Sequence, residues 1–215
     1  PLWGRTKAGL SQFFSDPAAD GIGVALSYFP TPDSSDVTYC TGDEATPTVA
    51  LAKLSAEAAP ADAQEQKLLA SMAVQSFAFG GTPMYQALYG ALAFASVFAS
   101  GHPDEQIVVV LVTDGVPGES CDYTQNNNIP KIAALAGWAH DNPPNVTTFT
   151  IGLAGSQEQD MTTVAQAGGG EAFFLGASPN VTQDLFTKLD AIKQSNLGCT
   201  FKLPEGSSQK PADPS

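Results

Sequence analysis

Apolar residues recur along this chain of 215 residues at two alternating spacings. Some segments place an apolar residue at every third or fourth position, which is typical of a helix buried on one face, and others are short apolar runs typical of buried strands. The first pattern predicts helices at Trp3–Phe14, Asp62–Phe77, Pro83–Ser100, Pro130–His140, Ser156–Ala167 and Asn180–Leu197. The second predicts strands at Ile22–Phe29, Ile107–Val112, Val146–Leu153 and Ala172–Leu175, with a short edge strand at Thr48–Leu51.

Residues at the helix ends support these assignments. Asp62 is a suitable cap, and Pro130 suits a first helical turn. Ser156 and Gln159 have the spacing of a capping box, and Gly168–Gly170 is expected to end the helix that follows.

The helix at Pro83–Ser100 carries an apolar stripe at helical spacing. The stripe consists of Met84, Leu88, Ala91, Ala95 and Phe98. Its alanines would let the helix lie close to a sheet, so we expect this face to point inward.

The alternation of strands and helices indicates the fold class. It predicts βαβ units with right-handed crossovers and a mostly parallel sheet with helices on both faces. We therefore expect an α/β protein with a Rossmann-like, doubly wound sheet. Ile107–Val112 is apolar throughout, as expected of a central strand buried on both sides. Asp114 follows this strand, at the carboxyl end where such sheets bind ligands.

Composition and charge narrow the choice of partner. The net charge of −13, from 9 basic and 22 acidic residues, argues against nucleic acid, whose recognition requires clustered Lys and Arg. This charge suits a cation, a basic protein surface, or solubility alone. No apolar run approaches the ~20 residues that a membrane helix needs. The length fits one domain over residues 1–198, followed by a linker or the start of another domain over residues 199–215.

Two residues are candidate metal ligands. Thr82 lies in the Gly-Gly-Thr-Pro loop before the long helix, and Asp114 lies in the loop after the apolar strand. Both offer oxygen ligands, which hard cations such as Mg²⁺ prefer. The structural alternative is that Thr82 caps the helix and Asp114 is an ordinary turn residue. Glu119 and Asp122 follow closely and could add carboxylates, or they could be exposed loop acids.

Five short motifs follow one another in a characteristic order and spacing. They are Phe29-Pro30, the Gly-Gly-Thr-Pro loop, the Thr-Asp-Gly end of the apolar strand, the Val-Thr-Thr-Phe-Thr-Ile-Gly strand, and the Ala-Gly-Gly stretch before Ala-Phe-Phe. Together they resemble the von Willebrand factor A domain in its bacterial form. The resemblance runs from about Trp3 to Leu197.

The resemblance implies a metal-ion-dependent adhesion site for Mg²⁺, or for Mn²⁺ or Ca²⁺. It implies that Thr82 is the threonine of the second metal-binding loop and Asp114 the aspartate of the third. An acidic side chain of a partner protein would complete the coordination. The implied function is protein binding in adhesion or recognition, not catalysis, in an extracellular, periplasmic or cell-envelope location.

The chain departs from the family in its first metal-binding segment. The family carries a Asp-x-Ser-x-Ser motif on its first strand, and no such motif occurs here. In the strand order 3-2-1-4-5-6 the first strand lies between the strands that correspond to Ile22–Phe29 and Ile107–Val112. Without it, two apolar strand edges would face each other unpaired. We therefore expect the first strand and its motif to precede Pro1 in a longer protein.

The three cysteines, Cys40, Cys121 and Cys199, lack the spacing of a zinc site. Cys40 and Cys121 both follow strand ends on the expected ligand-binding side, so a Cys40–Cys121 disulfide is sterically plausible. Cys199 could pair with a cysteine beyond Ser215. The alternative is three free thiols in a reducing compartment.

Two other functions fit parts of the sequence. One is a Mg²⁺-dependent α/β hydrolase that acts on a phosphorylated substrate, with Asp114 as a metal ligand. Such a hydrolase requires further acidic residues at the ends of the other strands. The residues found there are Phe29-Pro30, Gly152 and Gly176, and none of them is acidic. The other is a degenerate domain of the same family that binds no metal and serves as a scaffold.

The gene sequence upstream of Pro1 tests the expected first strand. We expect it to encode an apolar strand that ends in Asp-x-Ser-x-Ser, because the metal site needs those oxygens and the sheet needs that strand. An upstream sequence with neither feature would contradict the expectation that the first strand and its motif precede Pro1.

Overall fold

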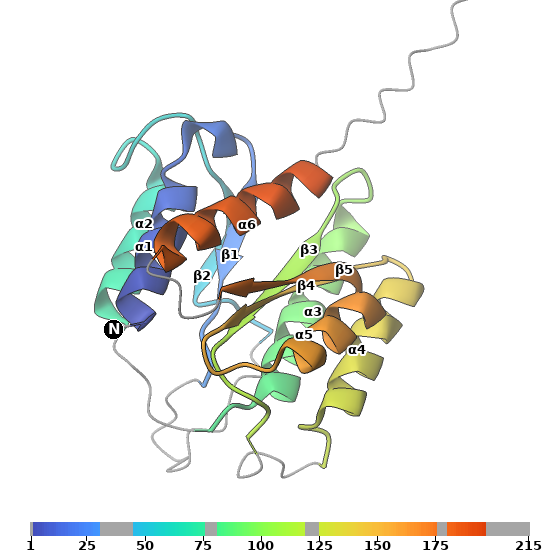
Figure 1. Ribbon diagram of the computed structural model, residues 1–215. Coiled ribbons are helices and arrows are strands. Elements are labelled where there is room, and N and C mark those ends of the chain that lie inside the picture. Colours follow the sequence, from blue (N-terminus) through green and yellow to red (C-terminus); the bar gives the residue numbers. More distant parts are fainter. Residues whose placement is uncertain (1, 31–44, 76–80, 119–124, 176–179, 197–215) are drawn as a thin grey trace, which may run out of the picture.

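A computed structural model describes residues 2–30, 45–75, 81–118, 125–175 and 180–196 (Figure 1). Its helices are α1 (Leu2–Phe14), α2 (Ala63–Val74), α3 (Met84–Gly101), α4 (Ile129–Asp141), α5 (Glu158–Ala167) and α6 (Val181–Asn196), with a short 3-10 helix at Pro17–Ala19. Its strands are β1 (Gly23–Leu26), β2 (Val49–Lys53), β3 (Val108–Thr113), β4 (Thr147–Leu153) and β5 (Gly169–Leu175). Each predicted helix and strand is present in the expected order, with ends that differ by a few residues.

The described strands form two sheets. β3, β4 and β5 form a parallel sheet in that order, and β1 and β2 form an antiparallel pair. β3 pairs with β4 without a register shift, from Val108 opposite Thr147 to Thr113 opposite Gly152. The α/β class and the parallel sheet are therefore confirmed. The described strands do not join into the single doubly wound sheet that the sequence predicts.

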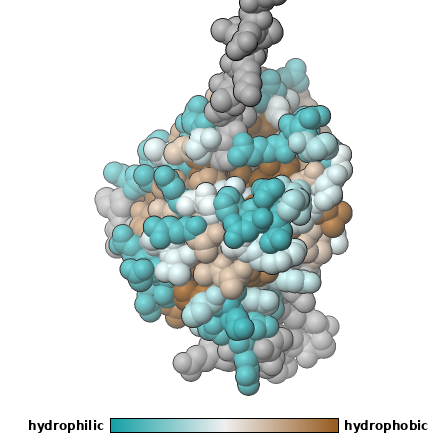
Figure 2. Space-filling model, turned by 90° about the vertical axis from the view of Figure 1, so that its right-hand side faces the viewer, coloured by the Kyte–Doolittle hydropathy of each residue, from teal (hydrophilic) through white to brown (hydrophobic). Residues whose placement is uncertain are grey.

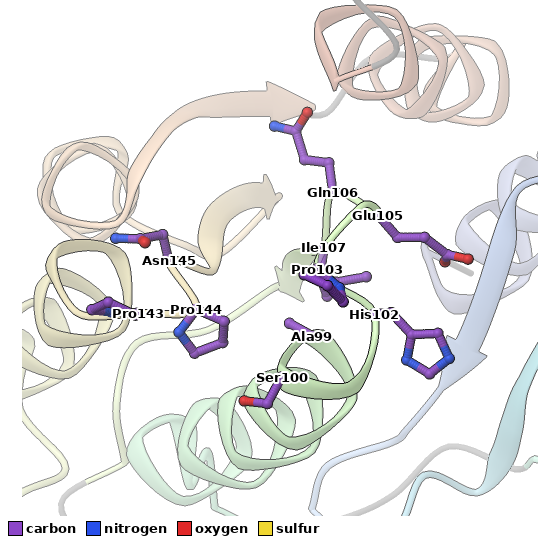
Figure 3. Close-up of a pocket in the computed structure, with 10 residues that line it drawn as sticks. All are labelled: Ala99, Ser100, His102, Pro103, Glu105, Gln106, Ile107, Pro143, Pro144 and Asn145. Carbon is purple, nitrogen blue, oxygen red and sulfur yellow. The ribbon is translucent and has the colours of Figure 1, made fainter.

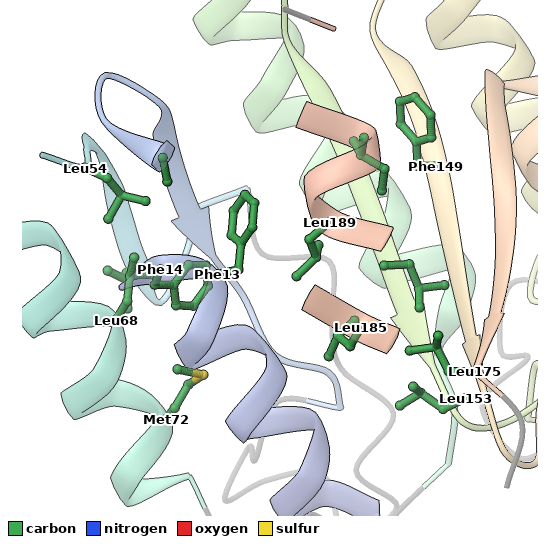
Figure 4. Packing of buried hydrophobic residues seen from close by; sticks show 14 residues of the cluster. Phe13, Phe14, Leu54, Leu68, Met72, Phe149, Leu153, Leu175, Leu185 and Leu189 are labelled. Carbon is green, nitrogen blue, oxygen red and sulfur yellow. The ribbon is translucent and has the colours of Figure 1, made fainter. Parts of the chain in front are cut away.

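Helices cover both faces of the parallel sheet. On one face, α6 packs against the sheet, and the hydrophobic cluster there continues beyond α6 to α1 and α2; it includes Phe13, Leu68 and Leu185 (Figure 4). On the other face, α3, α4 and α5 contribute to a second cluster, which includes Leu88 and Ile132. This arrangement confirms the expected covering of a parallel sheet on both sides.

Burial distinguishes β3 from β4. β4 is buried from Thr148 to Leu153, whereas only Leu111 and Thr113 are buried in β3. Alternate residues of Val108–Val112 pack into the two clusters in turn, as the period of a strand requires. Within the described residues β3 pairs with β4 alone. It is therefore an edge strand there, not the central strand that its apolar sequence predicts.

Local structure at α5 and β5 corrects two predictions. Ser156 does not open a capping box: the cap position of α5 is Gln157, which makes no side-chain cap bond. The Ser156 hydroxyl donates instead to the carbonyl of Leu153, at 2.8 Å. Gly168 ends α5 as its cap residue, as predicted, but β5 begins at Gly169 and not at Ala172.

The apolar stripe of α3 is buried only in part. Met84, Leu88 and Ala95 are buried, whereas Ala91 and Phe98 are half-buried. The two half-buried residues lie toward one flank of the buried stripe. Leu92 and Ala99, which the predicted stripe leaves out, are buried on the other flank. The prediction therefore identifies the inward face of α3 but places it too far toward Ala91 and Phe98.

The surface mixes polar and apolar residues. Figure 2 shows this interspersion on the face that lies to the right in Figure 1. Among the described residues, the exposed large apolar side chains include Val97 and Trp138, which are 77% and 64% exposed. None of the helices in the described ranges is long and apolar enough to cross a membrane.

Asp62 holds the start of α2, as the sequence predicts. Its Oδ1 accepts from the backbone amides of Gln64 and Glu65, at 2.8 and 2.9 Å, and its Oδ2 accepts from the amide of Ser55, at 2.6 Å. The side chain is only 3% exposed. Burial alone would raise the pKa of this carboxyl, but the donated hydrogen bonds outweigh it, so its pKa lies below the ordinary value.

This depressed pKa makes part of the stability dependent on pH. The contribution of Asp62 is fully present above the unfolded pKa of about 3.9 and is lost as the pH falls through the lower folded pKa. Asp62→Ala should cost about 2 kcal/mol at pH 7, because three amides lose their acceptor. The difference from the parent should shrink below about pH 4.

Urea unfolding at several pH values measures this difference. Asp16→Ala is the matched control, because Asp16 caps the exposed 3-10 helix through one bond to the Ala18 amide. It should cost less at pH 7 than Asp62→Ala. Equal losses, or a difference for Asp62→Ala that does not change with pH, would contradict the assignment.

Candidate functional site

Three loops meet at the carboxyl ends of β3 and β4. Asp114 follows β3, Gly155 follows β4, and Thr82 precedes α3. A Cβ added to Gly155 would overlap the carbonyl oxygen of Asp114. A Cβ added to Gly115 would lie 3.1 Å from the Thr82 hydroxyl. The fold therefore brings both predicted ligands to one edge of the sheet, at the carboxyl ends of β3 and β4.

The loop with Thr82 and the loop with Asp114 are joined by backbone contacts. The amide of Gly118 donates to the carbonyl of Thr82, at 3.0 Å. A Cβ added to Gly118 would lie 2.8 Å from the Thr82 nitrogen, closer than real Cβ contacts. Because no side chain separates them, the two loops pack backbone against backbone.

Thr82 does not act as the cap of α3. The cap position of α3 is Pro83, which makes no side-chain cap bond, and the amide of Met84 is bonded to the carbonyl of Thr82, at 2.8 Å. The structural alternative for the Thr82 hydroxyl therefore has no support. That hydroxyl lies instead against Gly115, the residue next to Asp114.

Asp114 lies in the bend that follows β3, next to a local side-chain bond made by Thr113. The amide of Gly115 donates to the hydroxyl of Thr113, at 3.2 Å, so the neighbouring threonine makes the local side-chain bond. Asp114 itself is exposed. Its carboxylate is thus presented to solvent at the rim of the sheet.

Asn127 is a residue of this region that the sequence analysis misses. Its Nδ2 donates to the carbonyls of Thr82 and Gly118, at 2.9 and 3.0 Å, and its Oδ1 accepts from the amide of Tyr85, at 3.0 Å. The side chain is 4% exposed. The only sequence sign is its place before the start of α4, where asparagines commonly cap helices; its neighbour Asn128 has that role.

The donors fit a divalent cation in kind but not in number. A threonine hydroxyl and a carboxylate are suitable oxygen ligands for Mg²⁺, which prefers octahedral coordination. Within the described ranges, no group of three or more His, Cys, Asp and Glu residues could hold a metal ion. Thr82 and Asp114 would therefore form only part of a coordination shell. Glu119 and Asp122 lie outside the described residues, as do Cys40, Cys121 and Cys199.

A separate hollow lies at the opposite end of β3 and β4 (Figure 3). Its volume is about 530 Å³, and its lining includes His102, Glu105 and Asn145. These polar groups make contacts of their own. The ring of His102 stacks on Phe98, with centroids 3.9 Å apart, and Glu105 pairs with Lys53, at 3.6 Å. The hollow is remote from the edge that carries Asp114.

The close packing at Gly155 predicts a specific sensitivity. Gly155→Ala should cost more than about 2 kcal/mol of unfolding free energy, because Gly155 has φ +118° and its Cβ would overlap Asp114. Gly21→Ala is the matched control, since Gly21 has φ +80° with open space around its Cβ position, and should cost about 1 kcal/mol.

Urea unfolding compares these two variants, and NMR amide shifts locate the disturbance. In Gly155→Ala the shifts of Asp114 and Gly115 should change, and in Gly21→Ala they should not. Equal losses of stability with unchanged Asp114 shifts would show that the two loops are not in contact.

No protein-family profile and no curated protein sequence matches this chain. The likeness to von Willebrand factor A domains therefore stands on the motifs of the sequence alone.

Proposed function

We propose that this chain is a von Willebrand factor A-type domain that binds a partner protein through a divalent cation. The observation that carries the proposal is the convergence of Thr82 and Asp114. They come from separate loops, and the packing of Gly115 against the Thr82 hydroxyl brings them to the edge where parallel sheets bind ligands.

In this proposal each residue has a simple task. The Thr82 hydroxyl and the Asp114 carboxylate hold Mg²⁺, Mn²⁺ or Ca²⁺ from one side, and the expected first-strand motif supplies further oxygens. A carboxylate of the partner binds the open side of the cation. Such recognition needs no general acid or base.

The edge of β3 that has no pairing partner within the described residues supports the expected first strand. Its sequence, Val-Val-Val-Leu-Val-Thr, carries no charge and no proline, which are the usual devices that keep an edge strand from pairing. An apolar strand beside β3 would cover the half-buried valines and end next to Asp114.

The electrostatic setting explains why a cation would be needed. The chain carries a net charge of −13, so an acidic partner would be repelled by the bare protein. A bound divalent ion would neutralise the carboxylates at the rim and offer an open coordination position to the partner's carboxylate. The proposed location is extracellular, periplasmic or in the cell envelope, where a Cys40–Cys121 disulfide could form.

Calorimetric titration with Mg²⁺, Mn²⁺ and Ca²⁺ tests this function. It should be done on the 215-residue chain, extended upstream wherever the gene encodes the expected strand. Asp114→Ala and Thr82→Ala should each weaken binding at least tenfold, which is about 1.4 kcal/mol of binding free energy. Asp104→Ala, which removes an exposed acid at the opposite end of β3, should leave the affinity unchanged.

Other outcomes of the titration would overturn the proposal. Equal weakening by Asp104→Ala would mean diffuse attraction to an acidic surface. Turnover of a phosphoester such as p-nitrophenyl phosphate that needs Mg²⁺ and Asp114 would favour the hydrolase. Absence of cation binding in the extended protein would favour a scaffold that binds no metal.

A further inference from the structure

One buried amide ties together the two loops of the proposed cation site. Asn127 donates both Nδ2 hydrogens, one to the carbonyl of Thr82 and one to the carbonyl of Gly118, at 2.9 and 3.0 Å. Its Oδ1 accepts from the amide of Tyr85, in the first turn of α3, at 3.0 Å. One side chain therefore contacts the loop before α3, the start of α3 and the loop after β3.

The carbonyl of Thr82 is the point on which these bonds converge. It accepts from Asn127, from the amide of Gly118 at 3.0 Å and from the amide of Met84 at 2.8 Å. Three donors from three segments fix the position and the orientation of this peptide group. The Cα of Thr82 is thereby fixed, and with it the position from which its hydroxyl reaches toward Gly115.

The type of side chain at position 127 follows from these bonds. The site requires two donors and one acceptor within a short, planar and uncharged group, at 4% exposure. Asparagine meets this requirement. Aspartate would keep the acceptor but place a buried negative charge against two carbonyl oxygens, and alanine would leave both carbonyls and the Tyr85 amide without this partner.

We propose that Asn127 is a positioning residue of the cation site. It does not contact the cation; it sets the separation and orientation of Thr82 and Asp114 by locking their loops together. The inference rests on the proposed cation-binding function. The proposal adds that the geometry of the site depends on the position of the start of α4, because Asn127 directly precedes the cap residue Asn128.

The alternative is that Asn127 only stabilises the fold and has no effect on the cation site. Loss of a buried amide lowers stability whatever its function. Asn128→Ala provides the matched control, since Asn128 caps α4 by accepting from the Lys131 amide at 3.2 Å. That substitution weakens the same helix start but leaves the bonds to Thr82, Gly118 and Tyr85 in place.

The experiment compares the parent, Asn127→Ala, Asn128→Ala and Asp114→Ala. Mg²⁺ affinity is measured by calorimetry at a temperature where all four proteins are folded, and amide hydrogen exchange is measured without metal. In Asn127→Ala, affinity should fall at least tenfold, and the amides of Gly118 and Tyr85 should exchange at least tenfold faster. In Asn128→Ala, affinity should stay within twofold of the parent, with exchange at Gly118 unchanged.

Two results would overturn the positioning role while leaving the proposed function intact. They are parental affinity in Asn127→Ala, and equal weakening in Asn127→Ala and Asn128→Ala, provided that Asp114→Ala still abolishes binding. Failure of the proposed function is a different result, in which the parent binds no Mg²⁺ or Asp114→Ala binds as well as the parent. Asn127 then has no cation site to position, and faster exchange at Gly118 would show a structural tie only.

Discussion

Parallel pairing without a register shift forces β3 and β4 to end at the same edge of the sheet. Thr113 lies opposite Gly152, so the loops that follow the two strands leave the sheet side by side. The turn at Asp114 then meets the turn at Gly155. A slip of one residue in this pairing would exchange the faces of every β3 side chain and separate the two turns. The site and both hydrophobic clusters therefore depend on this one register.

The absence of side chains allows the loops to approach so closely. Gly115, Gly118 and Gly155 each lie where a Cβ would contact or overlap the neighbouring loop. Two of these contacts involve Thr82 and one involves Asp114. The rim of the sheet is thus built from packed backbone, with two short polar side chains placed on it. Short side chains have few torsions, so fixing the backbone largely fixes their oxygens.

Local signals made most of the fold predictable. Asp62 is a cap in the structure because an acid before an apolar helix has nearby amides to accept from, and Pro130 lies in a first turn because its missing donor costs nothing there. Predictions failed where a distant contact prevailed. Ser156 turns back to Leu153 at the end of β4. β5 begins at Gly169, which pairs with Thr148 of β4, and Gly170 lies so close to β4 that a Cβ would overlap the Thr148 carbonyl.

The position of the candidate site was predictable in part. Asp114 could be placed at the ligand-binding edge because it follows a strand with a clear apolar pattern. Thr82 was proposed as its partner from the resemblance to a known family, and the structure places the two loops in contact. Asn127 could not be identified, because its three bonds join residues between 9 and 45 positions away, and no local pattern encodes them.

The edge of β3 that is unpaired in the described part of the chain connects the fold to the proposed function. Its valines are half-buried although both helical layers pack against the sheet, because β3 has a paired neighbour on one side only in the described chain. A parallel strand on the free side would remove this apolar surface from water and would end at the rim beside Asp114. Any oxygen ligands at the end of that strand would then lie beside Thr82 and Asp114. A single strand would thus both stabilise the sheet and complete the proposed cation site.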